Sequence, residues 1–258
     1  MARAAMFLYS LGAYGLFLAV FLYLIAFVGN LGVPRSVDLG PAAATTTAVA
    51  IDLLLIALFG LQHSVMARPA FKRWLTRRVP AAIERSTFVA AGSLVLALLF
   101  WQWRPLAGTV WQADGGTAIL LWSLFALGWA TALLSTFLIN HFDLFGLRQS
   151  WLHLLDRPLV PLAFRTTLLY RLVRHPLMLG LLMAFWFTPH MSVGHLLFAA
   201  GMTVYILVGV HFEERDLVRS LGKDYVKYRR ETPAFIPGLP GAQGDLPVQP
   251  DVPLRAGH

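Results

Sequence analysis

Four apolar runs of membrane-spanning length dominate the first 139 residues. The runs lie at 6–28, 42–66, 86–103 and 117–139. In the hydrocarbon core of a bilayer a backbone has to satisfy its own hydrogen bonds, so apolar runs of about 20 residues form helices there. Because 57% of the whole chain is hydrophobic, the pattern predicts an all-α integral membrane protein.

The charged residues between these runs predict how the helices are oriented. The segment 67–85 carries Arg68, Lys72, Arg73, Arg77, Arg78 and Arg85 against the single acid Glu84, whereas the loops near Arg35 and Arg104 are almost neutral. By the positive-inside rule the basic loop is cytoplasmic. We therefore expect a protein embedded in the lipid of a bacterial inner membrane with both termini cytoplasmic. The same placement argues against nucleic-acid binding despite the net charge of +8.

The second half of the chain has a different pattern. Residues 140–174 mix charged residues with apolar ones at spacings compatible with one helix face, which predicts an amphipathic segment along the cytoplasmic leaflet. The apolar run 176–188 is short and ends before Pro189, and the run 192–212 returns from it. We expect a helical hairpin whose open ends meet on the cytoplasmic side, giving about six membrane segments in all.

These patterns divide the chain into three parts. Residues 1–139 are the four-span region, residues 140–237 hold the interfacial segment, the hairpin and a polar helix interrupted near Gly222, and residues 238–258 are a Pro/Gly-rich tail. The tail after Pro240 is expected to be disordered. The chain contains no cysteine, which excludes disulfides and thiolate metal sites. Its histidines lack the spacing of metal or haem ligands, so we expect no metal.

The hairpin would bring charged residues together that are distant in sequence. Arg174 and His175 precede its first arm, and Glu213 and Glu214 follow its second. Charges this close to lipid are costly, which makes them functional candidates, although solvated helix anchors are the alternative. The guanidinium group of an arginine can donate two parallel hydrogen bonds to a carboxylate. A glutamate can bind an ammonium group or ribose hydroxyls, and an aromatic ring can stack on a purine or contact a sulfonium. Such a set complements S-adenosylmethionine and also other zwitterionic nucleotides.

The order and spacing of these residues resemble the isoprenylcysteine carboxyl methyltransferase superfamily of integral membrane proteins. The resemblance covers about the last third of the chain, ends at Ile236-Pro237, and departs from the pattern at Met178, near where relatives often have tyrosine. It implies S-adenosylmethionine as the methyl donor. The residues that it assigns to the donor are Arg174, His175, Pro176, Gly180, Glu213, Glu214, Leu217, Tyr225 and Tyr228.

A narrower resemblance extends over nearly the full chain. Segments 138–149, 174–180, 188–189 and 194–199 are similar to the methanethiol S-methyltransferase branch, and NnrU-like membrane proteins of nitrogen-oxide metabolism share part of the pattern. The likeness implies methylation of methanethiol to dimethyl sulfide. A methyltransferase for another small or lipidic acceptor, and a non-enzymatic NnrU-like protein, are the alternatives.

Methyl transfer to a thiol requires a thiolate, because a small thiol is mostly protonated at neutral pH. We therefore expect a base or a cationic group beside the acceptor. His141 is the first candidate for the base and His175 the second, with Arg229 as a cation able to hold the thiolate. His63, beside Gln62 in the second apolar run, is expected to be a hydrogen-bonded helix-packing residue.

Overall fold

The computed structural model describes residues 1–160 and 166–239. Within these residues, five helices are long and apolar enough to cross a membrane. They are α1 (Ala2–Gly29), α2 (Thr45–Ala67), α4 (Ala81–Gln102), α5 (Gly115–Ile139) and α10 (Val193–Leu221). The shorter apolar helix α9 (Pro176–Trp186) forms a hairpin with α10. The prediction of an all-α integral membrane protein with about six membrane segments is confirmed.

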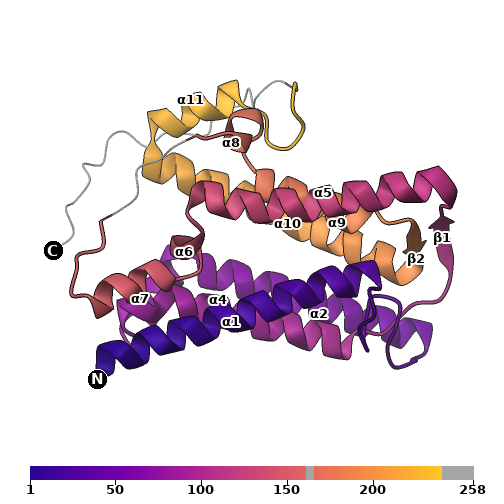
Figure 1. The fold of residues 1–258 in the computed structure, drawn as a ribbon, viewed down its shortest axis with the longest axis horizontal. Helices are drawn as coiled ribbons and strands as arrows, with labels where there is room; N and C mark the ends of the chain where they lie inside the picture. Colours follow the sequence, from indigo (N-terminus) through magenta and orange to yellow (C-terminus); the bar gives the residue numbers. More distant parts are fainter. Residues whose placement is uncertain (161–165, 240–258) are drawn as a thin grey trace.

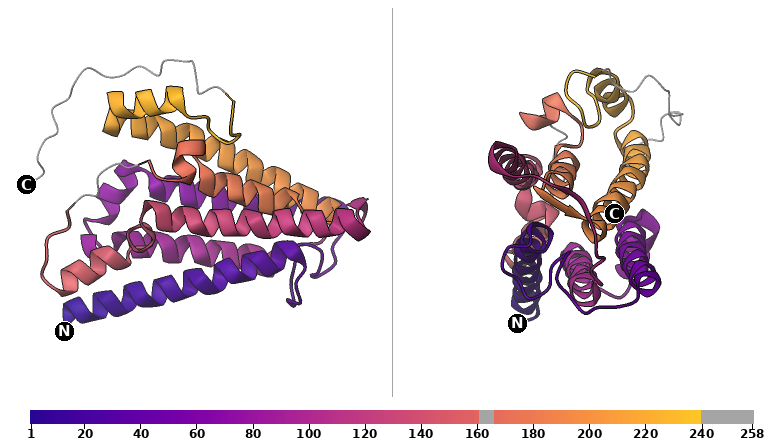
Figure 2. Two further views of the ribbon diagram at one scale, coloured as in Figure 1. Left: turned by 45° about the horizontal axis from the view of Figure 1, so that its top comes forward. Right: turned by 90° about the vertical axis from the view of Figure 1, so that its right-hand side faces the viewer.

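The membrane helices form two layers. Helices α1, α2 and α4 make one layer, and α5, α9 and α10 make the other (Figures 1 and 2). Aromatic side chains join the layers in the core, where the Phe198 ring of α10 lies 5.7 Å from Phe27 of α1 and 5.7 Å from Trp103 at the end of α4. Because lipid is as apolar as these side chains, close packing rather than water exclusion holds such helices together.

Helices α5 and α9 meet through glycines. A Cβ atom added at Gly180 would lie 2.5 Å from the backbone nitrogen of Ala132 and 2.5 Å from the carbonyl oxygen of Gly128. A Cβ atom added at Gly128 would lie 2.7 Å from the Gly180 carbonyl oxygen. The two backbones are therefore in direct contact, as is typical of small residues in membrane helix pairs. This contact fixes the position of the first turns of α9.

A small antiparallel ribbon closes one end of the molecule. Strand β1 (Thr109–Gln112) pairs with β2 (His190–Ser192), which is the turn of the hairpin. The indole of Trp111 also donates to the carbonyl oxygen of Thr188 at 2.9 Å. The ribbon lies at the opposite end of the bundle from the N-terminus (Figure 1). Apolar patterning gave no sign of it, because its strands are only four and three residues long.

Short polar helices lie outside the membrane helices. They are α3 (Pro69–Leu75), α6 (His141–Leu144), α7 (Leu147–Leu154), α8 (Leu169–Leu172) and α11 (Lys223–Glu231). The segment 140–174 is therefore not one continuous helix in its described part. Gly146 separates α6 from α7 with a backbone φ of 89°, a conformation that ends a helix and favours glycine.

Helix α10 is longer than the sequence pattern indicated. It continues past residue 212 to Leu221, so Glu213 and Glu214 lie inside it rather than beyond its end. Gly222 then ends α10 and separates it from α11, as predicted, with a φ of 58°. The predicted disorder after Pro240 falls outside the residues that the structure describes.

Candidate active site

A buried ion pair joins Arg174, just before the first helix of the hairpin, to Glu214 in the second helix. Arg174 Nη2 lies 2.6 Å from Glu214 Oε1, and Arg174 Nε donates to the same oxygen at 2.7 Å. The side chains are 3% and 10% exposed. Arg174 Nη1 donates to the carbonyl oxygens of Arg229 and Thr232. Burying either charge alone would cost several kcal/mol, so the two residues depend on each other.

Two further side chains surround Glu214. His175 Nε2 lies 3.1 Å from Glu214 Oε1, and Arg229 Nε donates to Glu214 Oε2 at 3.0 Å. On the other side of the imidazole, His175 Nδ1 lies 3.7 Å from Glu213 Oε2. The Glu213 side chain is half exposed. The structure thus brings Arg174, His175, Glu213, Glu214 and Arg229 together; we call them the ionic cluster.

The chain after α11 folds back over this cluster. The backbone nitrogen of Arg174 donates to the Pro233 carbonyl oxygen at 2.8 Å, and that of His175 donates to the Ala234 carbonyl oxygen at 3.1 Å. The Phe235 ring lies 5.9 Å from the imidazole of His175. Sequence reasoning missed this strap, Pro233–Phe235. The only signal was the neighbouring Ile236-Pro237 in the superfamily pattern.

Two phenols of α11 face the same region. Tyr228 donates to the Tyr170 carbonyl oxygen at 2.5 Å, and its ring packs edge to face on the buried Tyr225. Burial raises the pKa of Tyr228 to about 12. Burial, followed by the nearby Glu214 charge, also raises the pKa of Tyr225. Both side chains therefore stay neutral at physiological pH. Tyr225 is a buried packing residue, and the half-buried Tyr228 is the one whose ring can contact a ligand.

The other residues that the resemblance assigned to the donor lie around the cluster. Pro176 is buried at the first position of α9, where a missing backbone N–H costs nothing. Leu217 is half-buried one turn after Glu213. Gly180 lies against α5, so its evident role is helix packing.

An apolar cavity of about 320 Å³ lies between the two helix layers. Leu177 and Met178, in the first turn of α9 just after Arg174, His175 and Pro176, form part of its wall. Its lining side chains are mostly aliphatic and aromatic. The polar or charged exceptions are His63, Arg85, Ser93, Thr136, His141 and Tyr205. A charged cluster beside an apolar chamber can hold a polar ligand and a small apolar one next to each other.

Comparison with known proteins identifies the family. The chain is 52% identical to methanethiol S-methyltransferase 2 of Bradyrhizobium diazoefficiens over 92% of each protein. It is also 52% identical to the methanethiol S-methyltransferase of Mycobacterium tuberculosis, over 92% of this chain and 98% of that protein. The chain belongs to the methanethiol S-methyltransferase family. The resemblance found in the sequence is thereby confirmed, and with it the assignment to a methyltransferase enzyme, which implies a methyl donor.

The chain is also similar to a second group of proteins. Nurim of Mus musculus is 30% identical over 66% of this chain and 68% of its own length. No family model matches the chain, and no solved structure matches it.

His141, the first candidate for the base, is enclosed by hydrogen bonds. Its Nδ1 lies 2.8 Å from Thr136 Oγ1, and its Nε2 lies 2.7 Å from the Tyr14 hydroxyl. Because Thr136 donates its own proton to the Leu133 carbonyl oxygen, we assign the hydrogen to Nδ1, so that Nε2 accepts from Tyr14. Burial lowers the pKa of His141, which keeps the ring neutral at pH 7. Both ring nitrogens therefore already have partners.

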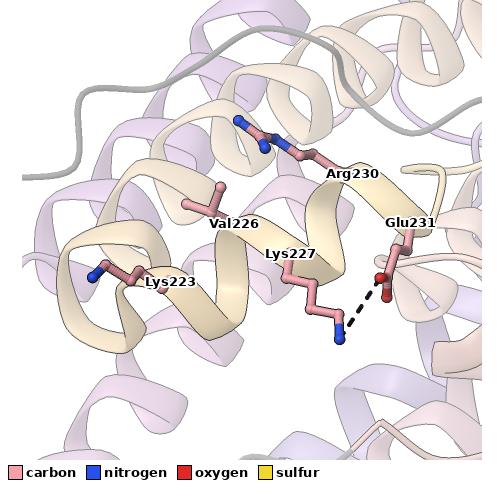
Figure 3. Close-up of a pocket in the computed structure, with 5 residues that line it drawn as sticks. All are labelled: Lys223, Val226, Lys227, Arg230 and Glu231. Atoms are coloured by element: carbon pink, nitrogen blue, oxygen red, sulfur yellow. Dashed lines mark ion pairs between the residues drawn. The ribbon is translucent and has the colours of Figure 1, made fainter.

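A second hollow lies on the opposite face of α11 (Figure 3). It is lined by Lys223, Val226, Lys227, Arg230 and Glu231. These residues recur three or four positions apart and so share one face of the helix, whereas Tyr225 and Arg229 belong to the face that meets the cluster. The Lys227–Glu231 ion pair spans 3.9 Å and is well exposed. This face supplies matched controls for the cluster.

Proposed function

We propose that the protein transfers the methyl group of S-adenosylmethionine to methanethiol and forms dimethyl sulfide. The family membership supports this reaction. The structural observation that carries it is the buried ionic cluster at the end of a membrane hairpin, adjoining an apolar cavity. In the reaction the thiolate sulfur forms a bond to the methyl carbon, the bond from that carbon to the sulfonium breaks, and its electron pair stays on the donor sulfur. One proton is released for each thiol consumed.

The cluster fits a zwitterionic donor. It contains two guanidinium groups, Arg174 and Arg229, and two carboxylates, Glu213 and Glu214, so both signs of charge are present. Arg174 and Glu214 satisfy each other and hold the site together. Glu213, half exposed, can accept from an ammonium group or ribose hydroxyls. The ring of Tyr228, packed on the buried Tyr225, can supply aromatic surface for the adenine or the sulfonium. We propose that the donor binds here, on the cytoplasmic side of a bacterial inner membrane.

The acceptor is proposed to come from the membrane. Methanethiol is small and apolar and partitions into lipid, and the cavity between the helix layers is lined mainly by apolar side chains. A site that excludes water also removes solvent from the thiolate and the sulfonium, whose opposite charges cancel as they react.

The test uses the purified full-length protein. Calorimetric titration should show binding of S-adenosylmethionine, and gas chromatography of the headspace should show dimethyl sulfide when methanethiol is added. Absence of dimethyl sulfide under all conditions that preserve donor binding would contradict the proposed acceptor. Competition by long-chain thiols would instead favour a lipidic acceptor.

The hydrogen bonds of His141 predict a positioning role for this residue. We expect His141→Ala to leave donor affinity unchanged and to lower turnover about tenfold, because it removes the link between Tyr14 and Thr136 at the cavity wall. The loss should be the same for methanethiol and for a more acidic thiol, since no proton acceptor is removed. Recovery of turnover with the acidic thiol alone would instead identify His141 as the base.

A further inference from the structure

A small polar niche borders the apolar cavity on the side of α2 and α4. His63 lines the cavity together with Arg85. The Nδ1 atom of His63 is buried and has no hydrogen-bond partner in the described part of the chain. The expectation that His63 is a hydrogen-bonded packing residue is therefore wrong for this atom: phenylalanine and tyrosine rings surround the imidazole, and rings offer it no strong acceptor or donor.

A missing side chain makes room beside this nitrogen. A Cβ atom added at Gly92 would lie 3.5 Å from His63 Nδ1 and 3.9 Å from Gln62 Oε1. The Gln62 oxygen is also buried without a hydrogen-bond partner among the described residues. Buried polar atoms are nearly always paired, so two unpaired atoms around one glycine indicate a place for a small polar group that the protein itself does not supply.

Arg85 adds a positive charge to this niche. It lines the cavity together with His63, and it makes no ion pair with any residue that the structure describes. The rest of the cavity wall nearby is apolar, including Phe59 and Phe88. A guanidinium group at the edge of an apolar chamber stabilises an anion that enters the chamber.

We propose that this niche binds the sulfhydryl group of the acceptor, an inference that rests on the proposed function. The S–H bond breaks, its electron pair stays on sulfur, and the proton forms an N–H bond with His63 Nδ1. Arg85 then stabilises the thiolate until it attacks the methyl group. His63 would thus be the base that the sequence analysis sought at His141 and His175.

The niche is connected to the ionic cluster by the cavity wall. Tyr205 packs against His63, with ring centroids 6.1 Å apart, and lies on α10, the helix that also carries Glu213 and Glu214. Leu177 and Met178, two and three residues after His175 in the first turn of α9, line the same cavity. One apolar chamber therefore separates a thiolate formed at His63 from the start of α9, which follows Arg174 and His175.

The size of the cavity sets the substrate class. An apolar cavity of roughly 150 Å³ is enough to hold benzene, and this cavity measures about 320 Å³. Methanethiol has one carbon and one sulfur and fills only a small part of it. The chamber should therefore accept small apolar thiols in general, including the aromatic thiol thiophenol, which is already largely ionised at neutral pH.

The experiment measures methylation of methanethiol and of thiophenol by three variants. His63→Ala should lower kcat/KM for methanethiol about a hundredfold, the lower range for loss of a general base. Most of that loss should disappear with thiophenol, because an ionised thiol needs no base. Arg85→Gln should raise KM for both thiols. Gly92→Ala should raise KM for methanethiol, because its methyl group fills the niche at ordinary contact distances.

Controls separate this inference from the proposed function. His153→Ala, Arg77→Gln and Gly12→Ala change the same residue types outside the cavity lining and should behave as wild type. Donor titration and thermal unfolding show whether each variant is folded. If His63→Ala does not fold, the KM of Gly92→Ala for methanethiol tests the inference instead. Two results would overturn the inference: wild-type kinetics in both His63→Ala and Gly92→Ala, or an equal loss of activity with both thiols in His63→Ala. The proposed function would still stand in either case if the wild-type protein forms dimethyl sulfide. No dimethyl sulfide from the wild-type protein would refute the function itself.

Discussion

Glu214→Gln should abolish measurable binding of S-adenosylmethionine while the protein still inserts into the membrane. The substitution keeps the size of the side chain and removes the charge that Arg174, His175 and Arg229 share. Arg174, only 3% exposed, is left as a buried cation without a counter-ion, which costs about 3–5 kcal/mol. We expect the site to open and the dissociation constant to rise at least a hundredfold, as measured by calorimetry. Arg174→Ala should have the same effect, because it removes the cation that pairs with the buried Glu214 carboxylate.

The matched control for Glu214→Gln is Glu231→Gln. Glu231 lies on the far face of α11 and pairs only loosely with Lys227, at 3.9 Å (Figure 3). An exposed pair of this kind contributes little, so donor affinity and thermal stability should not change. Wild-type donor affinity in both Glu214→Gln and Arg174→Ala would show that the donor binds elsewhere.

Gly180→Val should prevent α5 and α9 from packing. Any side chain at this position meets the backbone of Gly128 and Ala132 at about 2.5 Å, and backbone atoms cannot turn aside as a flexible side chain does. Overpacking of this kind typically costs about 1–3 kcal/mol and often more when backbones must separate. We expect a large fall in the thermal unfolding temperature and loss of methyl transfer, because α9 also places Arg174 and His175.

This variant also distinguishes two roles for Gly180. The superfamily resemblance assigns the residue to the donor, whereas the structure places it against α5. Gly12→Ala, on a face of α1 with nothing within 4 Å, should leave stability unchanged and serves as the control. A Gly180→Val protein with normal thermal stability and weakened donor binding would show that contact with the donor is the main role.

The ionic cluster could be predicted because helix geometry alone brings the two ends of a hairpin together. Arg174 and Glu214 lie forty positions apart, and the short run before Pro189 leaves them few other arrangements. The strap at Pro233–Phe235 could not be predicted in the same way, since it is held by two backbone hydrogen bonds that any residue type can accept. The niche at Gly92 could not be predicted from the sequence either, because it depends on the space left by a residue that has no side chain. Periodicity reports which faces are apolar, but not where two layers leave a gap between them.

The short helix α9 has a consequence for the lipid around it. Its 11 residues extend about 17 Å, whereas the hydrocarbon core is roughly 30 Å thick. Its neighbour α5 has 25 residues and is long enough to cross fully. Two neighbouring helices of such different hydrophobic length create a mismatch with the bilayer. We expect the bilayer to become thinner beside α9 to accommodate it. The rate of methyl transfer should therefore depend on bilayer thickness, because thickness sets the depth in the membrane at which a dissolved thiol reaches the methyl donor.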